Sequence, residues 1–161
     1  MKFKKKTKIK TQKKLIEIFE DNSLRLGKDS YIVFNGEIEI GSNIIFKGKN
    51  YFETGNKIES NCSFQDASIG KNNNIKLSSI INQSKVDNNN IIGPFCYIRD
   101  NSLIKNNCIV AAFVEVVRST FKNYSSASHR AFVGDAVIGS RTIIGAGVIF
   151  CNYSFKTLKK E

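Results

Sequence analysis

Several features that define common classes of protein are absent from these 161 residues. The sequence has one histidine, His129, and four cysteines that form no CxxC pair, so the spacings typical of zinc ligands are missing. It contains no run of about 20 apolar residues that could span a membrane as a helix. The basic N-terminus is not followed by the apolar stretch of a secretory signal. We therefore expect no metal site, no disulfides and a cytoplasmic protein.

Acidic residues are absent from the first fourteen positions, which contain eight lysines, and the formal net charge of the chain is +11. Such a basic run can bind nucleic acid or an anionic surface, but it is also typical of a solvated arm. The later sequence shows no basic surface interleaved with aromatic residues, as an RNA platform would. We therefore expect residues 1–11 to be a flexible basic arm and consider nucleic acid an unlikely partner, and we expect residues 154–161 to be a tail.

A single apolar pattern with a period of six residues runs through most of the chain. It begins at Ile40, continues through Phe46, Phe52 and Ile58, and reaches Phe150 with occasional steps of five, and no position in it is polar. Neither an α-helix nor a two-sided strand predicts this period. It is the signature of a parallel β-helix, in which each short strand forms one wall of a coil. The pattern therefore predicts an all-β domain over residues 40–153 with roughly six coils of about 18 residues.

The residues between the apolar positions fit the corners of such coils. Glycine often follows the apolar residue directly, as expected where the backbone turns or approaches another segment closely. The position four residues after the apolar residue is often small and includes Cys62, Cys96 and Cys108, where a free cysteine acts as a small apolar residue. The asparagine runs at 72–74 and 88–90 favour turns.

Residues 12–21 predict a short amphipathic helix, since Leu15, Ile18 and Phe19 lie at helical spacing. We expect this helix to cover the open first coil and residues 22–39 to lead into the repeat. The last coil has no such cover, which favours association with another segment or chain.

The segment from Ile92 to Tyr153 resembles a known family. It contains Ile-Gly-Pro-Phe-Cys-Tyr-Ile-Arg (92–99), Ser-Ala-Ser-His (126–129), Ile-Gly-Ala-Gly (144–147) and Cys-Asn-Tyr (151–153). These strings, in this order and spacing, resemble the acetyltransferase domain of the bacterial bifunctional enzyme that makes UDP-N-acetylglucosamine. The resemblance implies a left-handed parallel β-helix with a short N-terminal helix, assembled as a homotrimer with clefts between subunits. It also implies acetyl-CoA as the cosubstrate and an amino-sugar acceptor.

The resemblance assigns a role to each matching residue. His129 matches the catalytic base that takes a proton from the acceptor amine, and Glu115 matches an acid near that histidine. Arg99 matches an arginine that holds the sugar phosphate. Three further positions match residues lining the acetyl-CoA and substrate cleft: Ala146, Asn152 and Tyr153.

Other positions depart from the family pattern. Val117 stands in place of a phosphate-binding lysine, Phe132 in place of a substrate-binding tyrosine and Ile143 in place of a sugar-contacting asparagine. The family's uridylyltransferase domain and the later coils that supply much of its acetyl-CoA site have no counterpart in these 161 residues. Three hypotheses remain open: an amino-sugar acetyltransferase, with Arg99 and Arg118 holding an anionic group; a catalytically inactive trimeric scaffold or partner subunit; and an anion or nucleic-acid binder that uses the basic arm.

Overall fold

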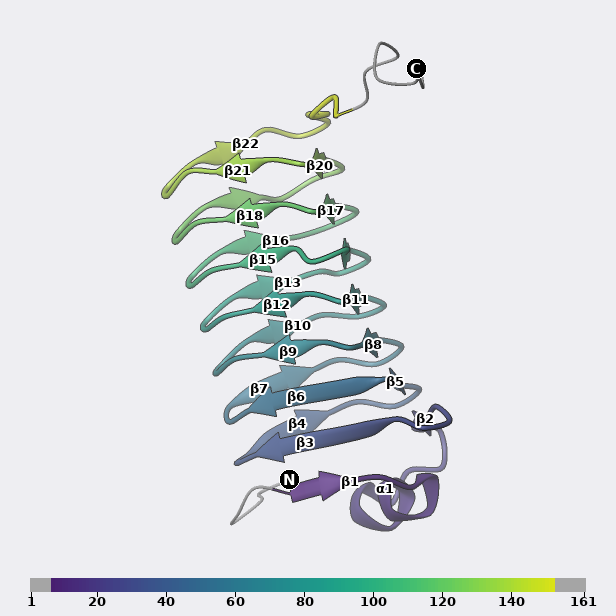
Figure 1. Ribbon diagram of the computed structural model, residues 1–161. Coiled ribbons are helices and arrows are strands. Elements are labelled where there is room, and N and C mark those ends of the chain that lie inside the picture. Colours follow the sequence, from purple (N-terminus) through teal and green to yellow (C-terminus); the bar gives the residue numbers. More distant parts are fainter. Residues whose placement is uncertain (1–6, 153–161) are drawn as a thin grey trace, which may run out of the picture.

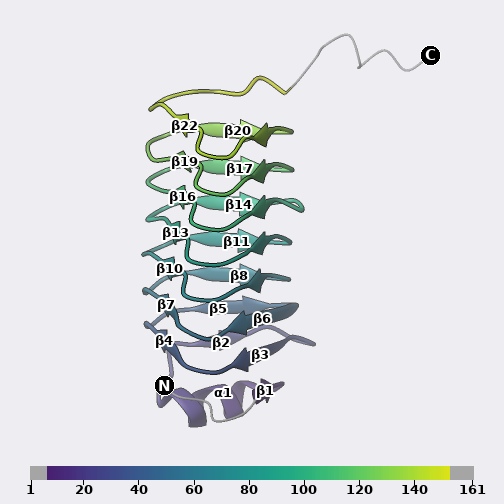
Figure 2. The same cartoon turned by 90° about the vertical axis from the view of Figure 1, so that its left-hand side faces the viewer.

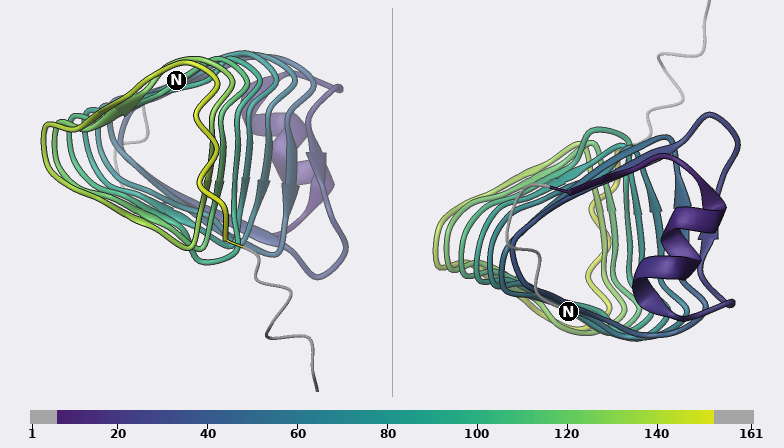
Figure 3. Two further views of the ribbon diagram at one scale, coloured as in Figure 1. Left: turned by 90° about the horizontal axis from the view of Figure 1, so that it is seen from above. Right: turned by 90° about the horizontal axis from the view of Figure 1, so that it is seen from below.

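The computed structural model describes residues 7–152, which form a parallel β-helix with three walls (Figures 1 and 2). Seen along the axis from the C-terminal end, the chain runs clockwise as it approaches the viewer (Figure 3), so the helix is left-handed. This hand is opposite to the usual right-handed crossover between parallel strands. The predicted all-β, left-handed parallel β-helix with a short N-terminal helix is confirmed.

Each coil contributes one short strand to each wall, in the order wall B, wall A, wall C. Wall A contains β1 (Thr7–Ile9), β3 (Tyr31–Asn35), β6 (Lys49–Glu53), β9 (Ser68–Ile69), β12 (Lys85–Val86), β15 (Leu103–Ile104), β18 (Thr120–Phe121) and β21 (Val137–Ile138). Wall B contains β2 (Arg25–Leu26), β5 (Ile45–Lys47), β8 (Ser63–Gln65), β11 (Ile80–Asn82), β14 (Tyr97–Arg99), β17 (Glu115–Val117) and β20 (Phe132–Gly134). Wall C contains β4 (Ile38–Ile40), β7 (Asn56–Ile58), β10 (Asn74–Ile75), β13 (Ile91–Ile92), β16 (Ile109–Val110), β19 (Ser126–Ala127) and β22 (Ile143–Ile144).

The apolar pattern found in the sequence is the interior of the stack. All its residues from Phe46 to Ile144 are buried, and Ile40 and Phe150 at its two ends are partly buried. Each side chain packs between its equivalents in the coils above and below, because the parallel strands pair in register. Ile81, for example, lies opposite Phe64 on one side and Ile98 on the other. A period of six therefore places one inward side chain on each wall.

The stack begins earlier than the sequence pattern indicates. Residues 22–39 were expected to lead into the repeat, with strand suggested at Tyr31, Val33 and Ile38. In the structure β2, β3 and β4 pair in parallel with β5, β6 and β7 and form a complete first coil. The buried side chains Ile32 and Phe34 belong to this coil. The six-residue pattern fails there because Leu26 and Phe34, the equivalents of Phe46 and Phe52, are eight residues apart. Walls B and C have seven strands each, and wall A has seven besides the antiparallel β1, which gives seven coils of three strands.

The corners of the stack are held by side chains that bond the backbone of the next coil. At the corner between walls A and C, the buried Asn73 accepts from Asn90 N at 2.9 Å and donates to Asn56 Oδ1 at 3.1 Å. At the corner between walls B and A, Ser84 Oγ accepts from Ser102 N, and Ser102 Oγ accepts from Ser119 N, both at 3.2 Å. Strand pairing leaves these backbone N–H groups without a partner. The side-chain contacts satisfy them and so avoid the free-energy cost of burying an unpaired N–H group.

The cysteines predicted to lie inside the coils do so. Cys62, Cys96 and Cys108 are buried, and Cys151 is exposed; all four are free thiols. Burial raises the pKa of Cys62 to about 11 and that of Cys96 to about 12, because a thiolate loses its hydration in the core. Both thiols therefore stay protonated at neutral pH and act as packing groups.

Replacing Asn73 by alanine should destabilise the protein by about 2–3 kcal/mol, since it leaves Asn90 N–H and the carbonyl of Asp87 buried without this partner. Equilibrium urea unfolding measures the loss. The matched control is Lys71→Ala on the same corner, where the exposed side chain should matter by less than about 0.5 kcal/mol. Equal stability of the two variants would mean that water replaces the amide without cost.

The N-terminal end of the stack is capped by three different contacts. Strand β1 pairs antiparallel with β3 and covers the edge of wall A. Helix α1 (Gln12–Phe19) buries Leu15 against the core, and Thr11 caps it by accepting from Lys14 N at 3.2 Å. The amide of Gln12 donates to Leu24 O and accepts from Leu26 N, both at 2.6 Å, so it serves the edge of wall B. Each contact occupies backbone groups that an open edge would leave unpaired.

The N-terminal cap differs from what was expected of the basic arm, and the expected C-terminal tail lies outside the described residues. The basic arm was assigned to residues 1–11, yet residues 7–9 form a paired strand, because the alternation of Thr7, Lys8 and Ile9 places Ile9 in the core. Residues 1–6 and the proposed tail at 154–161 lie outside the described residues. Helix α1 has eight residues, and no helix of the described part of the chain could cross a membrane.

Candidate functional site

The candidate residues gather on wall B and its two corners in the last coils. Strands β14, β17 and β20 pair in register there, with Tyr97 opposite Glu115 and Val117 opposite Gly134. A residue at the end of one strand therefore lies directly above its equivalent in the coil below. This places Arg99, Glu115, Arg118 and Asp135 on neighbouring levels of a single surface, although the chain separates them by many residues.

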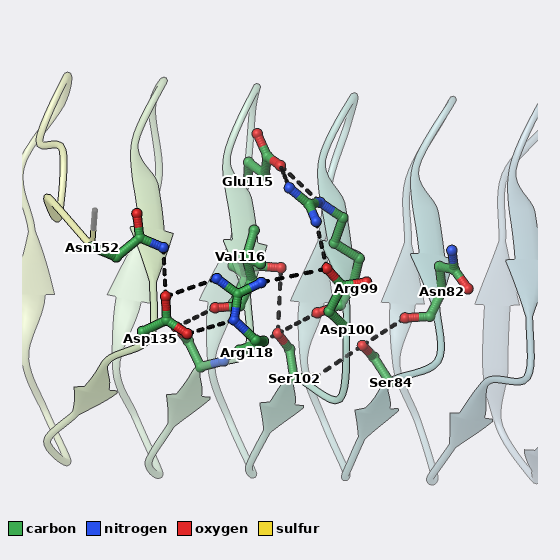
Figure 4. A network of polar contacts seen from close by, with 12 residues as sticks. Asn82, Ser84, Arg99, Asp100, Ser102, Glu115, Val116, Arg118, Asp135 and Asn152 are labelled. Atoms are coloured by element: carbon green, nitrogen blue, oxygen red, sulfur yellow. Dashed lines mark hydrogen bonds and ion pairs between the residues drawn. The ribbon is translucent and has the colours of Figure 1, made fainter. Parts of the chain in front are cut away.

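Six side chains of this surface form a continuous chain of contacts, here called the polar ladder: Glu115, Arg99, Asp100, Arg118, Asp135 and Asn152 (Figure 4). Arg99 donates to Glu115 Oε1 from Nε at 2.9 Å and lies 2.8 Å from it through Nη2, and its Nη1 reaches Asp100 Oδ2 at 2.5 Å. Arg118 donates from Nε and Nη2 to the two oxygens of Asp135, at 2.5 and 2.8 Å.

Shared carboxylates connect the successive levels of the ladder. Arg118 Nη1 lies 3.7 Å from the same Asp100 oxygen that Arg99 contacts, so Asp100 links the two arginines. Asn152 donates from Nδ2 to Asp135 Oδ2 at 2.6 Å and joins the last described residue to the ladder. The contacts with Arg118 and then with Asn152 hold the pKa of Asp135 below its ordinary value, since both favour the charged carboxylate.

The five charged side chains are 29–49% exposed, and a single ion pair at that exposure typically contributes only about 0–1 kcal/mol to stability. With Asp100, Glu115 and Asp135 ionised against Arg99 and Arg118, the ladder has a net charge of −1 at neutral pH. A charged network of this size at one place of a surface is the kind of feature that points to a binding site.

His129 and Ala146 lie together at the other edge of wall B, on the corner that connects it with wall C. Gly147 N donates to the carbonyl of His129 at 3.1 Å, which places the 146–147 turn one coil above the 129–130 turn. Both side chains are exposed. The imidazole takes no hydrogen bond from any residue between 7 and 152 and is open to a substrate.

The predicted residues therefore fall into two groups. Arg99, Glu115 and Asn152 belong to the polar ladder, which crosses wall B from Glu115 at the start of β17 to Asp135 after the end of β20, whereas His129 and Ala146 lie on the corner before wall B. Glu115 was expected to lie near His129 and orient it, but the contacts of its carboxylate are with Arg99. Tyr153 lies outside the described residues.

Three apolar residues occupy the positions where the family pattern has polar groups. Val117 is 1% exposed, lies opposite Arg99 and directly precedes Arg118, and Phe132 is half-buried on the next strand. Ile143 is on the outer face of wall C and is 81% exposed. None of the three can offer a hydrogen bond or a charge to a ligand.

Asp100 and Asp135 were not identified from the sequence, and Arg118 only as a possible anion contact. The sequence feature that could have identified these residues is their spacing of one coil, which can be recognised only once the coil length is known. Positions 100, 118 and 135 each follow a strand of wall B and carry alternating charge. Side chains one coil apart at the same corner are neighbours, just as residues four apart are on a helix.

One surface hollow borders the polar ladder: a shallow hollow of about 370 Å³ is lined by Asn101 and Ser102, which follow the ladder residue Asp100. A shallow hollow of about 420 Å³ beside Glu39, Lys57 and Glu59 lies near the N-terminal end of the stack, far from the ladder. Among residues 7–152, no three histidine, cysteine, aspartate or glutamate side chains could hold a metal ion. A single chain thus presents its candidate residues on an open face.

Comparison of the sequence with known proteins agrees with the repeat architecture seen in the structure. Residues 83–118, which include four ladder residues, match the family model "Bacterial transferase hexapeptide (six repeats)". The bifunctional protein GlmU of Buchnera aphidicola subsp. Acyrthosiphon pisum is 34% identical over 91% of this chain and 34% of its own length. GlmU of Baumannia cicadellinicola is 39% identical over 73% of this chain and 26% of its own length.

The chain spans about a third of the length of the curated GlmU relatives it matches first. Among solved structures, the UDP-N-acetylglucosamine acyltransferase of Francisella novicida aligns with 17% identity and a TM-score of 0.31, over 73% of this chain and 59% of that one. The sequence matches and the coil architecture together identify the chain as a hexapeptide-repeat β-helix that resembles the acetyltransferase domain of the bifunctional GlmU proteins.

Proposed function

We propose that this protein is an acyltransferase that moves an acetyl group from acetyl-CoA to the amine of an amino sugar. The observation that carries the proposal is the position of His129. It is the chain's only histidine, it is exposed, and it lies on the same corner as Ala146, one coil below. The similarity to GlmU proteins over nine-tenths of the chain supports the same class of reaction.

The chemistry requires a group that can take up one proton. The amine attacks the thioester carbonyl, the new N–C bond forms, and the C–S bond breaks to release the thiol of coenzyme A. The attacking nitrogen must lose a proton on the way, and a histidine with a pKa near neutrality is suited to accept it. The proton then neutralises the departing thiolate. In this proposal Ala146, Asn152 and Tyr153 line the cleft for the acetyl donor and acceptor.

We also propose that the working unit is a homotrimer. The candidate residues of one chain lie on an open face, and a neighbouring subunit would turn that face into a cleft. Exposed apolar side chains support such packing: Phe95 and Phe113 stack with ring centroids 5.2 Å apart on the corner that also presents His129. Exposed apolar groups of this kind are frequent where subunits meet.

A second candidate function is a catalytically inactive trimeric scaffold or partner subunit. The observation that favours it is Val117, a buried apolar residue between two arginines that already pair with carboxylates. A protein that no longer binds the substrate would tolerate valine at position 117 in place of the family's lysine.

Acetyl-CoA turnover distinguishes the two functions. The purified protein is mixed with acetyl-CoA and a panel of amino sugars, and release of the free thiol is followed. We expect turnover with at least one amino sugar and a rise in melting temperature with acetyl-CoA, since a ligand that binds the folded state stabilises it. Reactions without acceptor serve as the control for hydrolysis. The scaffold function predicts neither turnover nor a shift in melting temperature.

A further inference from the structure

The polar ladder restricts which acceptor can bind beside it. We propose that the acceptor carries no phosphate where it meets the ladder, so that the substrate class is an unphosphorylated amino sugar. This inference rests on the proposed function for its substrate, but the charge argument behind it concerns the ladder alone.

Both arginines of the ladder are already committed to carboxylates. All three nitrogens of Arg99 contact Glu115 or Asp100, at 2.5–2.9 Å. Arg118 forms a two-pronged contact with Asp135, the geometry in which a guanidinium would otherwise bind a phosphate. A phosphate could replace these partners only by leaving the displaced carboxylates unpaired beside it, and like charges at that distance repel.

Among the described residues, strands β14, β17 and β20 and the residue after each carry no cation other than Arg99 and Arg118. Strand β17 ends in Val117, which lies opposite Arg99 and is 1% exposed, and the next strand, β20, ends in Gly134 followed by Asp135. The ladder's balance of two arginines against three carboxylates therefore stands at −1. This local charge opposes an anion even though the whole chain has a formal charge of +11.

An unphosphorylated amino sugar fits the same surface. Its amine is cationic in solution, which the net negative charge attracts, and its hydroxyls are hydrogen-bond donors. Glu115 Oε2 accepts no hydrogen bond from the described residues, while Oε1 is held by Arg99. Arg99 thus fixes the carboxylate and leaves one oxygen for a sugar hydroxyl or ammonium group.

Binding of inorganic phosphate tests the charge argument without any turnover. Titration calorimetry compares the wild type with the variant Asp100→Asn/Asp135→Asn, which keeps the shape of both side chains and frees the arginines. We expect the variant to bind phosphate at least about tenfold more tightly than the wild type. Equal binding, or tighter binding by the wild type, would overturn the proposal. If the double variant does not fold, Glu115→Gln alone provides the same comparison at Arg99.

Acceptor selectivity tests the substrate class. We expect the wild type to favour glucosamine over glucosamine 1-phosphate by about tenfold or more in kcat/KM, and the double variant to lose most of that preference. A wild type that prefers the phosphorylated acceptor would overturn the proposal. Absence of turnover with either acceptor would contradict the proposed function instead, and the phosphate titration would then decide whether the ladder excludes phosphate.

Discussion

Replacing His129 by alanine should lower the rate of acetyl transfer by about 10²–10⁴-fold while the fold remains intact. The rate falls because the amine then has no positioned base to receive its proton. The fold survives because the side chain is exposed and takes no hydrogen bond from the described residues. Steady-state thiol release measures the rate, and circular dichroism with thermal melting confirms the fold.

The control for this variant is Lys71→Ala, an exposed substitution three coils away from His129, which should leave the rate unchanged. The loss in the histidine variant should appear mainly in kcat, because a base acts on the reacting complex and contributes little to binding. A His129→Ala protein with wild-type turnover would remove His129 from the mechanism.

Replacing Phe46 by alanine should destabilise the protein by about 3–5 kcal/mol, the range found when a buried phenylalanine is deleted. Phe46 is 0% exposed, stacks on Phe64 with centroids 5.7 Å apart and meets Phe52 edge-on at 5.9 Å. Its removal leaves a cavity at the centre of this aromatic cluster, and the neighbouring coils cannot close it because their strands are fixed in register.

The neighbouring residue on the same strand provides a matched control. Ile45 points away from the core and is 39% exposed, so Ile45→Ala should cost less than about 1 kcal/mol. Urea unfolding of both variants gives the difference. Similar losses at the two positions would show that the cluster does not dominate the stability of the first coils. Hydrogen exchange should locate the effect of Phe46→Ala in β2, β5 and β8, since coils contact only their neighbours.

The fold could be predicted from the sequence because each wall needs one inward side chain per six residues. Nothing else in the coil has to be apolar, so the pattern from Phe46 to Ile144 remains readable through every step of five. The first coil could not be predicted in the same way. Its strand β3 is paired on both sides, with β1 and β6, and buries three consecutive residues, so its pattern follows the cap as well as the coil.

The candidate site was predictable only in part. The strings around His129 and Asn152 led to these residues, and the structure places Arg99, Glu115 and Asn152 in a common network. Which partners they bond could not be predicted, because the contacts join residues one coil apart and depend on the register of β14, β17 and β20. Glu115 lies opposite Tyr97 in this register, and Arg99 bonds it diagonally from two residues further along the adjacent strand.

Strict parallel register also makes the coil a unit of length. Adjacent strands in a sheet are about 4.8 Å apart, so each added coil moves everything beyond it by that distance along the axis and changes nothing else. A coil duplicated between β7 and β12 would therefore carry the polar ladder and His129 further from the N-terminal cap with their mutual geometry preserved. The distance from the cap to the site is thus an adjustable dimension of this protein, and the arrangement of groups within the site is not.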